Sequence, residues 1–282
     1  MRVWLFAPGH EERKVDKALA SLDAEGDARP DLVILDWEDA VPPAEKATAR
    51  EVTLNRIGAL DLDTRHRVVV RVNHLGSDWF AADHQKLQGE FLGAVMLPKV
   101  ETDAQIHAAL DLDLPIAILL ESALGVQRAF ELCSVHPQVR YAAFGPLDLL
   151  ADLGGEWTPE SEETLYARQR VAIAARAARL VAALDGPYPR LRDLDGLLDD
   201  SRRGRRMGYG GRMVIHPAQV PVVHEAFAPT EDELDFARRV VEAAQAGESE
   251  GRGAVSVDGR FVDPPVIRWA ESVLARSEPS QA

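Results

Sequence analysis

Cysteine is almost absent from this chain of 282 residues, in which Cys133 is the only one. An internal disulfide is therefore impossible, and a cysteine-based zinc site is not expected. A chain that uses so little cysteine fits a reducing compartment, so we expect a cytoplasmic protein. Cys133 itself falls on the apolar face of a predicted helix and is interpreted as core packing.

Long hydrophobic runs and an excess of basic residues are also missing. No stretch approaches the roughly 18 consecutive apolar residues of a membrane span, and the first residues mix acids and bases where a signal peptide has an apolar centre. The chain has 32 Lys and Arg against 46 Asp and Glu, a net charge of -14. Such a balance gives no general affinity for phosphate backbones. We expect neither a membrane nor a nucleic acid as a partner.

What the chain does have is a repeated alternation of short apolar runs with amphipathic stretches, the pattern of βα units. The eight predicted strands are Val3–Pro8, Leu32–Trp37, Val68–Val72, Ala94–Pro98, Ile116–Glu121, Tyr141–Gly145, Ala183–Tyr188 and Met213–His216. The helices predicted between them are Glu12–Ala24, Ala44–Ile57, Trp79–Leu87, Asp103–Leu110, Leu124–Cys133, Thr164–Leu184 and Leu194–Met207. No glycine-rich dinucleotide fingerprint follows the first strand. Eight buried strands with short crossovers predict an α/β fold, a (β/α)₈ TIM barrel.

The pattern changes after Pro217. A further helix is predicted over Asp232–Ala246, then a polar linker over residues 247–253, a hairpin over Val255–Val262 and a last helix over Pro264–Arg276. We therefore expect a catalytic barrel domain over residues 1–228. Residues 229–282 would form a C-terminal extension that acts as a lid or as an oligomerisation arm.

Polar side chains follow the predicted strands where each strand ends. In a TIM barrel the active site lies at the carboxyl ends of the strands, so such residues are candidates for function. They are Asp36, Glu38, Arg71, Lys99, Glu121, Asp148 and His216.

Glu121 and Asp148 are the candidates for a metal site. Magnesium usually takes one or two protein carboxylates and completes its octahedron with water and substrate oxygens. Two carboxylates from adjacent strand ends meet that need. The alternative is that one or both only cap the following helix.

Arg71 is a candidate for gripping a substrate carboxylate through paired hydrogen bonds. The alternative is a salt bridge to Asp36 or Glu38 that joins neighbouring strands. Those two acids in turn either contribute to the site, by orienting Arg71 or supporting metal-bound water, or cap a helix.

Lys99 and His216 each have two interpretations. A lysine at a strand end can form a Schiff base with a ketone substrate, but it can also simply pair with a carboxylate. His216 either lines the site or is a structural histidine.

Eight segments in the same order give the chain its resemblance to the citrate lyase beta subunit and malyl-CoA lyase group of the HpcH/HpaI aldolase superfamily. The likeness covers nearly the whole chain. The segments are Leu5–Gly9, Ile34–Val41, Arg71–Asn73, Leu97–Glu101, Leu120–Ala123, Phe144–Leu149, Ile215–Gln219 and Gly259–Pro265.

The resemblance implies a magnesium-dependent lyase that cleaves a 3-hydroxyacyl-CoA-type thioester into an acyl thioester and a 2-oxo acid. It implies that Glu121 and Asp148 hold Mg²⁺ and that Arg71 grips the substrate's carboxylate or carbonyl end. Asp263 matches a general acid or base on a lid that closes over a neighbouring subunit's site. Such proteins are trimers or hexamers, so a homotrimer or hexamer is expected.

The sequence departs from the family pattern after Pro8-Gly9. Family members have basic residues near the coenzyme A phosphates there, whereas this chain has Glu11 and Glu12 and keeps only Arg13. Two acids would repel a diphosphate. A class II aldolase acting on free 2-oxo acids therefore stays open as an alternative, as does a carrier-dependent subunit without activity of its own.

Overall fold

The computed structural model of the chain describes residues 2–158, 160–249 and 255–275. Eight parallel strands form a closed barrel in which β8 pairs with β1. The strands are β1 Val3–Pro8, β2 Leu32–Asp36, β3 Val68–Arg71, β4 Ala94–Leu97, β5 Ile116–Leu120, β6 Val139–Phe144, β7 Ala182–Asp185 and β8 Gly211–Val214. The predicted TIM barrel is confirmed, and each predicted strand overlaps an observed one.

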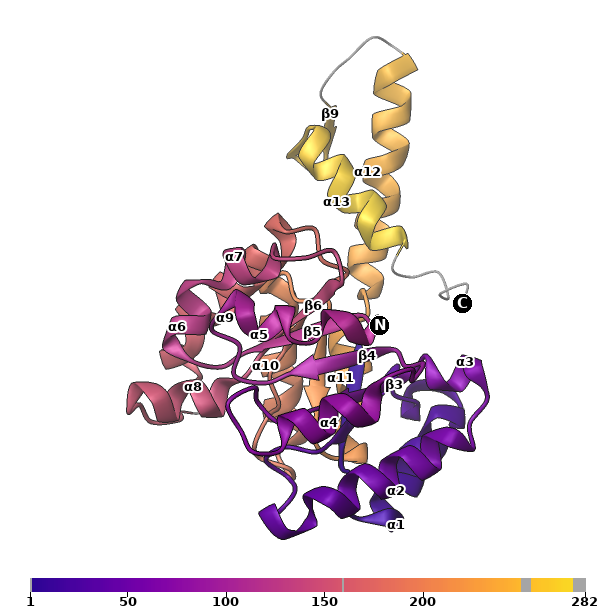
Figure 1. Cartoon of the computed structure of the whole chain (residues 1–282). Helices are drawn as coiled ribbons and strands as arrows, with labels where there is room; N and C mark the ends of the chain where they lie inside the picture. The colour runs from indigo at the N-terminus through magenta and orange to yellow at the C-terminus, as the bar shows by residue number, and fades with distance from the viewer. Residues whose placement is uncertain (1, 159, 250–254, 276–282) are drawn as a thin grey trace. The chain divides into compact units, whose positions relative to one another are not determined.

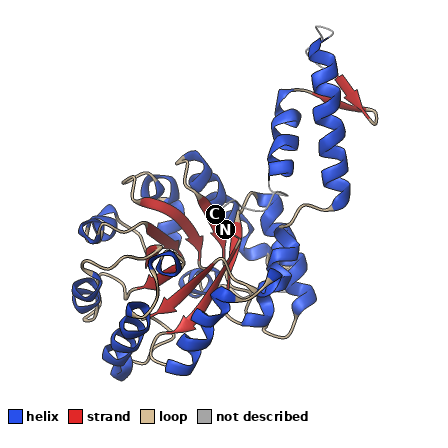
Figure 2. Cartoon of the chain, turned by 90° about the vertical axis from the view of Figure 1, so that its right-hand side faces the viewer, coloured by secondary structure: helices blue, strands red, loops and turns tan. Residues whose placement is uncertain are grey.

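Helices surround the strands of the barrel (Figures 1 and 2). They are α1 Glu12–Ala20, α2 Lys46–Gly58, α3 Leu62–Arg65, α4 Phe80–Leu87, α5 Asp103–His107, α6 Ala123–Gln127, α7 Ala129–Cys133, α8 Pro146–Leu153, α9 Leu165–Ala177, α10 Leu194–Met207 and α11 Val220–Phe227. Strand residues alternate between two cores, because successive side chains point to opposite faces. One set, including Trp4, Ile34 and Met96, fills the barrel interior, and the other packs under the helices.

The helix predicted over Thr164–Leu184 is wrong at its C-terminal end. Helix α9 stops at Ala177, and β7 already begins at Ala182. Arg179 has a φ of 59°, and the N–H of Leu180 donates to the carbonyl of Ala175, which closes the helix as a left-handed cap. Glycine is the usual residue at such a cap, so the sequence carried no stop signal.

Three further predictions need correction. The helix expected over Leu124–Cys133 is divided at Arg128 into α6 and α7. Three helices, α3, α8 and α11, were not predicted at all. Residues 247–249 of the expected linker belong to helix α12, and residues 250–253 lie outside the described residues.

Two arginines and two aspartates form a buried cluster between the barrel and helices α9 and α10. Arg168 contacts Asp185 at 2.5 Å and Asp200 at 2.9 Å. Arg212 pairs with Asp200 and also lies 3.8 Å from Asp185. All four side chains are almost fully buried, so the two charges of each sign compensate one another where water cannot.

The structure divides the chain into two compact units, residues 1–227 and 228–282. The second unit contains α12 Glu231–Ser249, strands β9 Val255–Val257 and β10 Arg260–Val262, and α13 Pro264–Ala275. The two strands form an antiparallel hairpin, as predicted. The second unit has its own apolar core, formed by Ala237, Val240, Val257, Val262, Ala270 and Val273.

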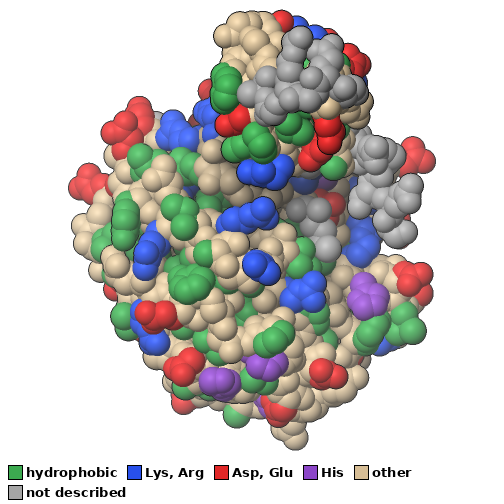
Figure 3. Space-filling model, turned by 90° about the horizontal axis from the view of Figure 1, so that it is seen from above, with side chains coloured by type: hydrophobic (Ala, Val, Ile, Leu, Met, Phe, Trp, Pro, Cys, Tyr) green, Lys and Arg blue, Asp and Glu red, His purple; other side chains and the backbone are tan. Residues whose placement is uncertain are grey.

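Basic, acidic and apolar side chains are interspersed over the face of the molecule seen in Figure 3. The excess of acidic residues therefore does not make this face uniformly acidic. Across the described part of the chain, no helix combines the length and apolar character needed to cross a bilayer.

Candidate active site

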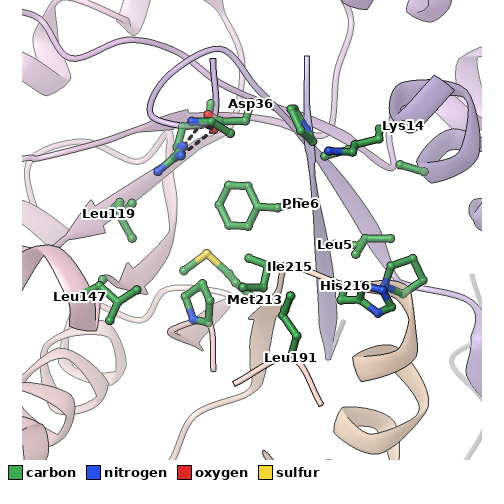
Figure 4. Close-up of a pocket in the computed structure, with 18 of the residues that line it drawn as sticks. Leu5, Phe6, Lys14, Asp36, Leu119, Leu147, Leu191, Met213, Ile215 and His216 are labelled. Carbon is green, nitrogen blue, oxygen red and sulfur yellow. Dashed lines mark hydrogen bonds and ion pairs between the residues drawn. The ribbon is translucent and has the colours of Figure 1, made fainter. Parts of the chain in front are cut away.

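A cavity of about 550 Å³ opens at the carboxyl ends of the barrel strands. In Figure 4, Phe6 lies near the middle of the cavity, with Lys14 and His216 to one side and Leu119 and Leu147 to the other. Five of the predicted site residues line this cavity: Asp36, Arg71, Glu121, Asp148 and His216. The position agrees with the rule that barrel enzymes build their sites at this end.

Glu121, directly after β5, and Asp148, in the first turn of α8 after β6, both line the cavity. Glu121 is 2% exposed, and among the described residues no Lys or Arg side-chain nitrogen lies within 4.0 Å of its carboxylate, which accepts from the backbone N–H of Lys99 at 2.8 Å. Burial and the negative charge of Asp148 raise the pKa of Glu121 to about 8. A Cβ atom at Gly145 would lie 2.5 Å from the Glu121 Oε2, so this glycine leaves room for the carboxylate.

These two carboxylates fit a hard divalent cation. The negative charge of Asp148 disfavours ionisation of Glu121, and a cation bound by both would remove that cost. Within the described residues, no cluster of three or more His, Cys, Asp or Glu could hold a metal, so the pair suits an ion that keeps several water or substrate ligands. Neither residue is a cap: Ser122 caps α6, and no side chain caps α8.

Arg71 is held by two acids at the end of β2. Its Nε and Nη2 donate to the two carboxylate oxygens of Asp36, both at 2.7 Å, and its Nη1 lies 3.1 Å from Glu38. The structural alternative raised for Arg71 is therefore present. A guanidinium has five N–H donors, so Arg71 retains hydrogens for a ligand in the cavity that it lines. The strong pairing fixes its orientation and its charge.

Lys99 pairs with carboxylates, as one of its two interpretations predicted. Its Nζ lies 2.5 Å from Glu38 and 3.2 Å from Asp39. Burial alone would lower the pKa of Lys99, but the hydrogen bond and charge of Glu38 outweigh it and raise the pKa above its usual value. A Schiff base requires a neutral amine, so this environment works against that chemistry.

A buried lysine that sequence reasoning missed supports the loop after β2. Lys46 donates from Nζ to the carbonyls of Trp37 and Glu38, both at 2.8 Å, and to Asn73 Oδ1 at 2.6 Å. Asn73 in turn donates to Asp83 through its backbone and its side chain. This network joins the loop of Glu38 to the loop that follows Arg71. A lysine at a helix start gives no sign of such burial in the sequence.

Two lysines of α1, also not predicted, line the same cavity as the acidic pair. Lys14 and Lys17 are exposed and lie one turn apart, a spacing that a helical projection of α1 would have revealed. Arg13 is exposed but does not line the cavity. Glu11 pairs with Lys14 at 2.7 Å, and Glu12 pairs with Arg56 at 3.1 Å.

His216 combines both of its proposed roles. It lines the cavity, and its Nδ1 accepts a hydrogen bond of 3.1 Å from the backbone N–H of Ala218, at the start of the short helix Pro217–Gln219. When the ring is neutral, that bond places the proton on Nε2.

Asp263 belongs to the second compact unit. It lies between β10 and α13, where its carbonyl accepts a hydrogen bond from Ile267 N–H and its Oδ1 lies 3.4 Å from Val266 N. Its side chain is partly exposed.

Comparison with known proteins supplies the family. Residues 2–217 match the HpcH/HpaI aldolase/citrate lyase family, and residues 165–279 match a family of C–C bond lyases of the TIM-barrel fold. A citrate lyase subunit beta-like protein of Deinococcus radiodurans is 41% identical, over 98% of this chain and 96% of that protein. A (3S)-malyl-CoA thioesterase of Cereibacter sphaeroides is 33% identical, over 97% of this chain and 93% of that protein.

Among solved structures, CitE from Mycobacterium tuberculosis in complex with magnesium, acetoacetate and coenzyme A is similar throughout. The TM-score is 0.84 at 34% sequence identity, covering 98% of this chain and 97% of that one. The match of the family model to most of the chain agrees with the barrel. The chain belongs to the HpcH/HpaI aldolase/citrate lyase family and is a carbon–carbon lyase of the TIM-barrel fold.

Proposed function

We propose that this protein is a magnesium-dependent lyase, or a synthase in reverse, that acts on a 3-hydroxyacyl-CoA-type thioester and yields an acyl thioester and a 2-oxo acid. One observation carries the proposal: a single cavity joins the Glu121 and Asp148 pair to the lysines of α1. The acidic pair suits a hard cation, and the lysines suit phosphates. The similar CitE structure, which holds magnesium, acetoacetate and coenzyme A, supports the assignment.

Glu121 and Asp148 would hold the ion, and Arg71 would bind the carboxylate or carbonyl end of the substrate. When bound, magnesium would supply Lewis-acid stabilisation to the oxygens of the oxo acid. Arg71 suits its task because Asp36 and Glu38 keep its guanidinium charged and oriented before a ligand arrives. Asp36, Glu38 and Lys99 would thus act on the substrate through Arg71 and through the shape of the cavity. His216, which also lines the cavity, would present Nε2–H to the substrate.

We assign the proton transfers to Asp263. In cleavage, the substrate hydroxyl loses its proton, the carbon–carbon bond breaks, and its electron pair moves to the thioester, whose α-carbon then takes up a proton. A carboxylate on a lid can accept the first proton and deliver the second. If the lid serves a neighbouring subunit, the enzyme must be an oligomer, and we propose a homotrimer or hexamer. Light scattering measures this directly.

The phosphates of coenzyme A would lie against Lys14 and Lys17, near Arg13. Neither Glu11 nor Glu12 lines the cavity, and both are paired with cations. The repulsion expected between these acids and a diphosphate is therefore reduced. This arrangement favours a coenzyme A thioester over a free 2-oxo acid as substrate.

A substrate panel tests the function. Malyl-CoA, citramalyl-CoA and citryl-CoA, and the corresponding free acids, would be incubated with the enzyme in the presence and absence of Mg²⁺. We expect metal-dependent release of a 2-oxo acid from one or more thioesters. Asp263→Asn should lower kcat by about 10²-fold or more and leave Mg²⁺ affinity unchanged, because it removes a proton carrier. Cleavage that survives metal removal would refute the proposal, and cleavage of free acids alone would favour the aldolase alternative.

Magnesium affinity should depend on pH through Glu121. Its folded pKa of about 8 lies above the ordinary value of 4.5, so the metal-free fold favours the protonated form. The protonated carboxyl of Glu121 therefore stabilises the metal-free fold. This contribution to the free energy of unfolding is fully present below about pH 4.5 and is lost as the pH rises through about 8. Because Mg²⁺ binds the carboxylate, its apparent affinity should fall by up to about tenfold for each pH unit below 8.

Titration calorimetry at several pH values checks this expectation. Repeating it in buffers of different ionisation enthalpy gives the number of protons released, which should approach one per Mg²⁺ well below pH 8 and vanish above it. A Mg²⁺ affinity that does not change with pH would contradict the predicted role of Glu121.

A further inference from the structure

Four carboxylates contact or approach Lys99, which is more than a magnesium ion needs. Asp148 and, from the loop after β2, Glu38 and Asp39 lie around its ammonium group, whereas Glu121 accepts a hydrogen bond from its backbone N–H. Lys99 Nζ lies 2.5 Å from Glu38 Oε1, 3.2 Å from Asp39 Oδ2 and 3.9 Å from Asp148 Oδ1.

Two hydrogen bonds to side chains hold the backbone of Lys99 in place. Its N–H donates to Glu121 Oε1 at 2.8 Å, and its carbonyl accepts from Gln105 Nε2 at 2.9 Å. Its φ of 52° is in the left-handed region, which costs a non-glycine residue conformational energy. This backbone conformation lets Lys99 donate its N–H to Glu121, a predicted metal ligand. Its side chain at the same time reaches Glu38 and Asp39, the surplus acids.

The surplus acids differ in how much they depend on Lys99. Glu38 is buried and is also paired with Arg71 at 3.1 Å. Asp39 is more exposed, and within the described residues Lys99 supplies the only Lys or Arg nitrogen within 4.0 Å of it. Removing the Lys99 ammonium would therefore free Asp39 first.

The two common divalent cations respond differently to an added carboxylate. Mg²⁺ keeps several waters and uses one or two carboxylates, whereas Ca²⁺ accepts six to eight oxygen ligands in flexible geometry. A third carboxylate that is free to move to the ion therefore favours Ca²⁺. We infer that Lys99 determines the metal specificity of the site, by occupying Glu38 and Asp39 so that only Glu121 and Asp148 remain for the ion. This inference rests on the proposed magnesium site.

The experiment compares Mg²⁺ and Ca²⁺ affinities of the full chain by titration calorimetry. In Lys99→Met, we expect Ca²⁺ affinity to rise by about tenfold or more relative to Mg²⁺ affinity, because a freed carboxylate serves the larger ion better. Loss of one positive charge by itself would strengthen the binding of both divalent cations alike, since the Coulomb term depends on charge. The ratio of the two affinities separates these effects.

Three further variants complete the design. Lys99→Arg keeps a cation beside Glu38 and Asp39 and should keep the wild-type ratio. Adding Asp39→Asn to Lys99→Met should restore that ratio. Lys86→Met removes an exposed charge on α4 and should change nothing. Circular dichroism checks folding, and Lys99→Gln replaces Lys99→Met if the latter does not fold.

The outcomes separate this inference from the proposed function. If the wild type binds no Mg²⁺, the metal site itself is wrong. If the wild type binds Mg²⁺ but Lys99→Met leaves the ratio of Ca²⁺ to Mg²⁺ affinity unchanged, the metal site stands and the role of Lys99 is overturned. A changed ratio that persists after Asp39→Asn is added would also overturn it.

Discussion

Glu121→Gln is expected to eliminate Mg²⁺ binding and to lower kcat/KM by about a thousandfold or more, because Lewis-acid catalysis supplies several kcal/mol. The substitution preserves the shape of the side chain and removes only its charge. Titration calorimetry and the thioester assay measure the two effects. Glu131→Gln on α7, where the glutamate is exposed and pairs with Arg128, is the matched control and should behave as wild type.

The stability of this variant provides a second check. The raised pKa of Glu121 means that its ionised form is unfavourable in the metal-free fold. A neutral glutamine should therefore leave the metal-free protein at least as stable as the wild type above pH 8. Loss of activity could then not be attributed to unfolding. A variant that binds Mg²⁺ with wild-type affinity would remove Glu121 from the metal site.

Arg168→Met is expected to produce the largest loss of stability. It leaves Asp185 and Asp200 buried with Arg212 as their only remaining cation in the cluster. Breaking a buried pair by removing one partner typically costs about 3–5 kcal/mol, because the remaining charge is neither solvated nor compensated. Urea denaturation followed by tryptophan fluorescence measures the free energy of unfolding, since Trp4 and Trp37 are both buried in the barrel.

Two further variants test whether an uncompensated buried charge causes the loss of stability. Adding Asp185→Asn restores the charge balance and should recover part of the lost stability. Arg202→Met removes an arginine from α10, the helix that carries Asp200, but its pairing with Glu225 is exposed, so the substitution should have little effect. If Arg168→Met were no more destabilising than Arg202→Met, the buried cluster would have no net role in stability.

The sequence by itself determined the barrel and the type of site. Strands buried on both faces must be nearly continuous apolar runs, so the eight strands could be located without tertiary information. Because the carboxyl ends of barrel strands converge, the polar residues that follow them had to meet, and Glu121, Arg71 and Asp148 do line one cavity. The resemblance to known lyases rested on the same strand-end segments.

Tertiary structure decided the features that depend on backbone conformation and on burial. The end of α9 is set by a left-handed arginine, and no local residue preference indicates such a stop. Lys46 and Lys99 are ordinary lysines in the sequence, yet one is buried against carbonyls and the other is surrounded by carboxylates. Whether a charged side chain pairs, supports a loop or faces a ligand depends on which distant residues the fold brings within about 4 Å of it, and a linear sequence does not contain those distances.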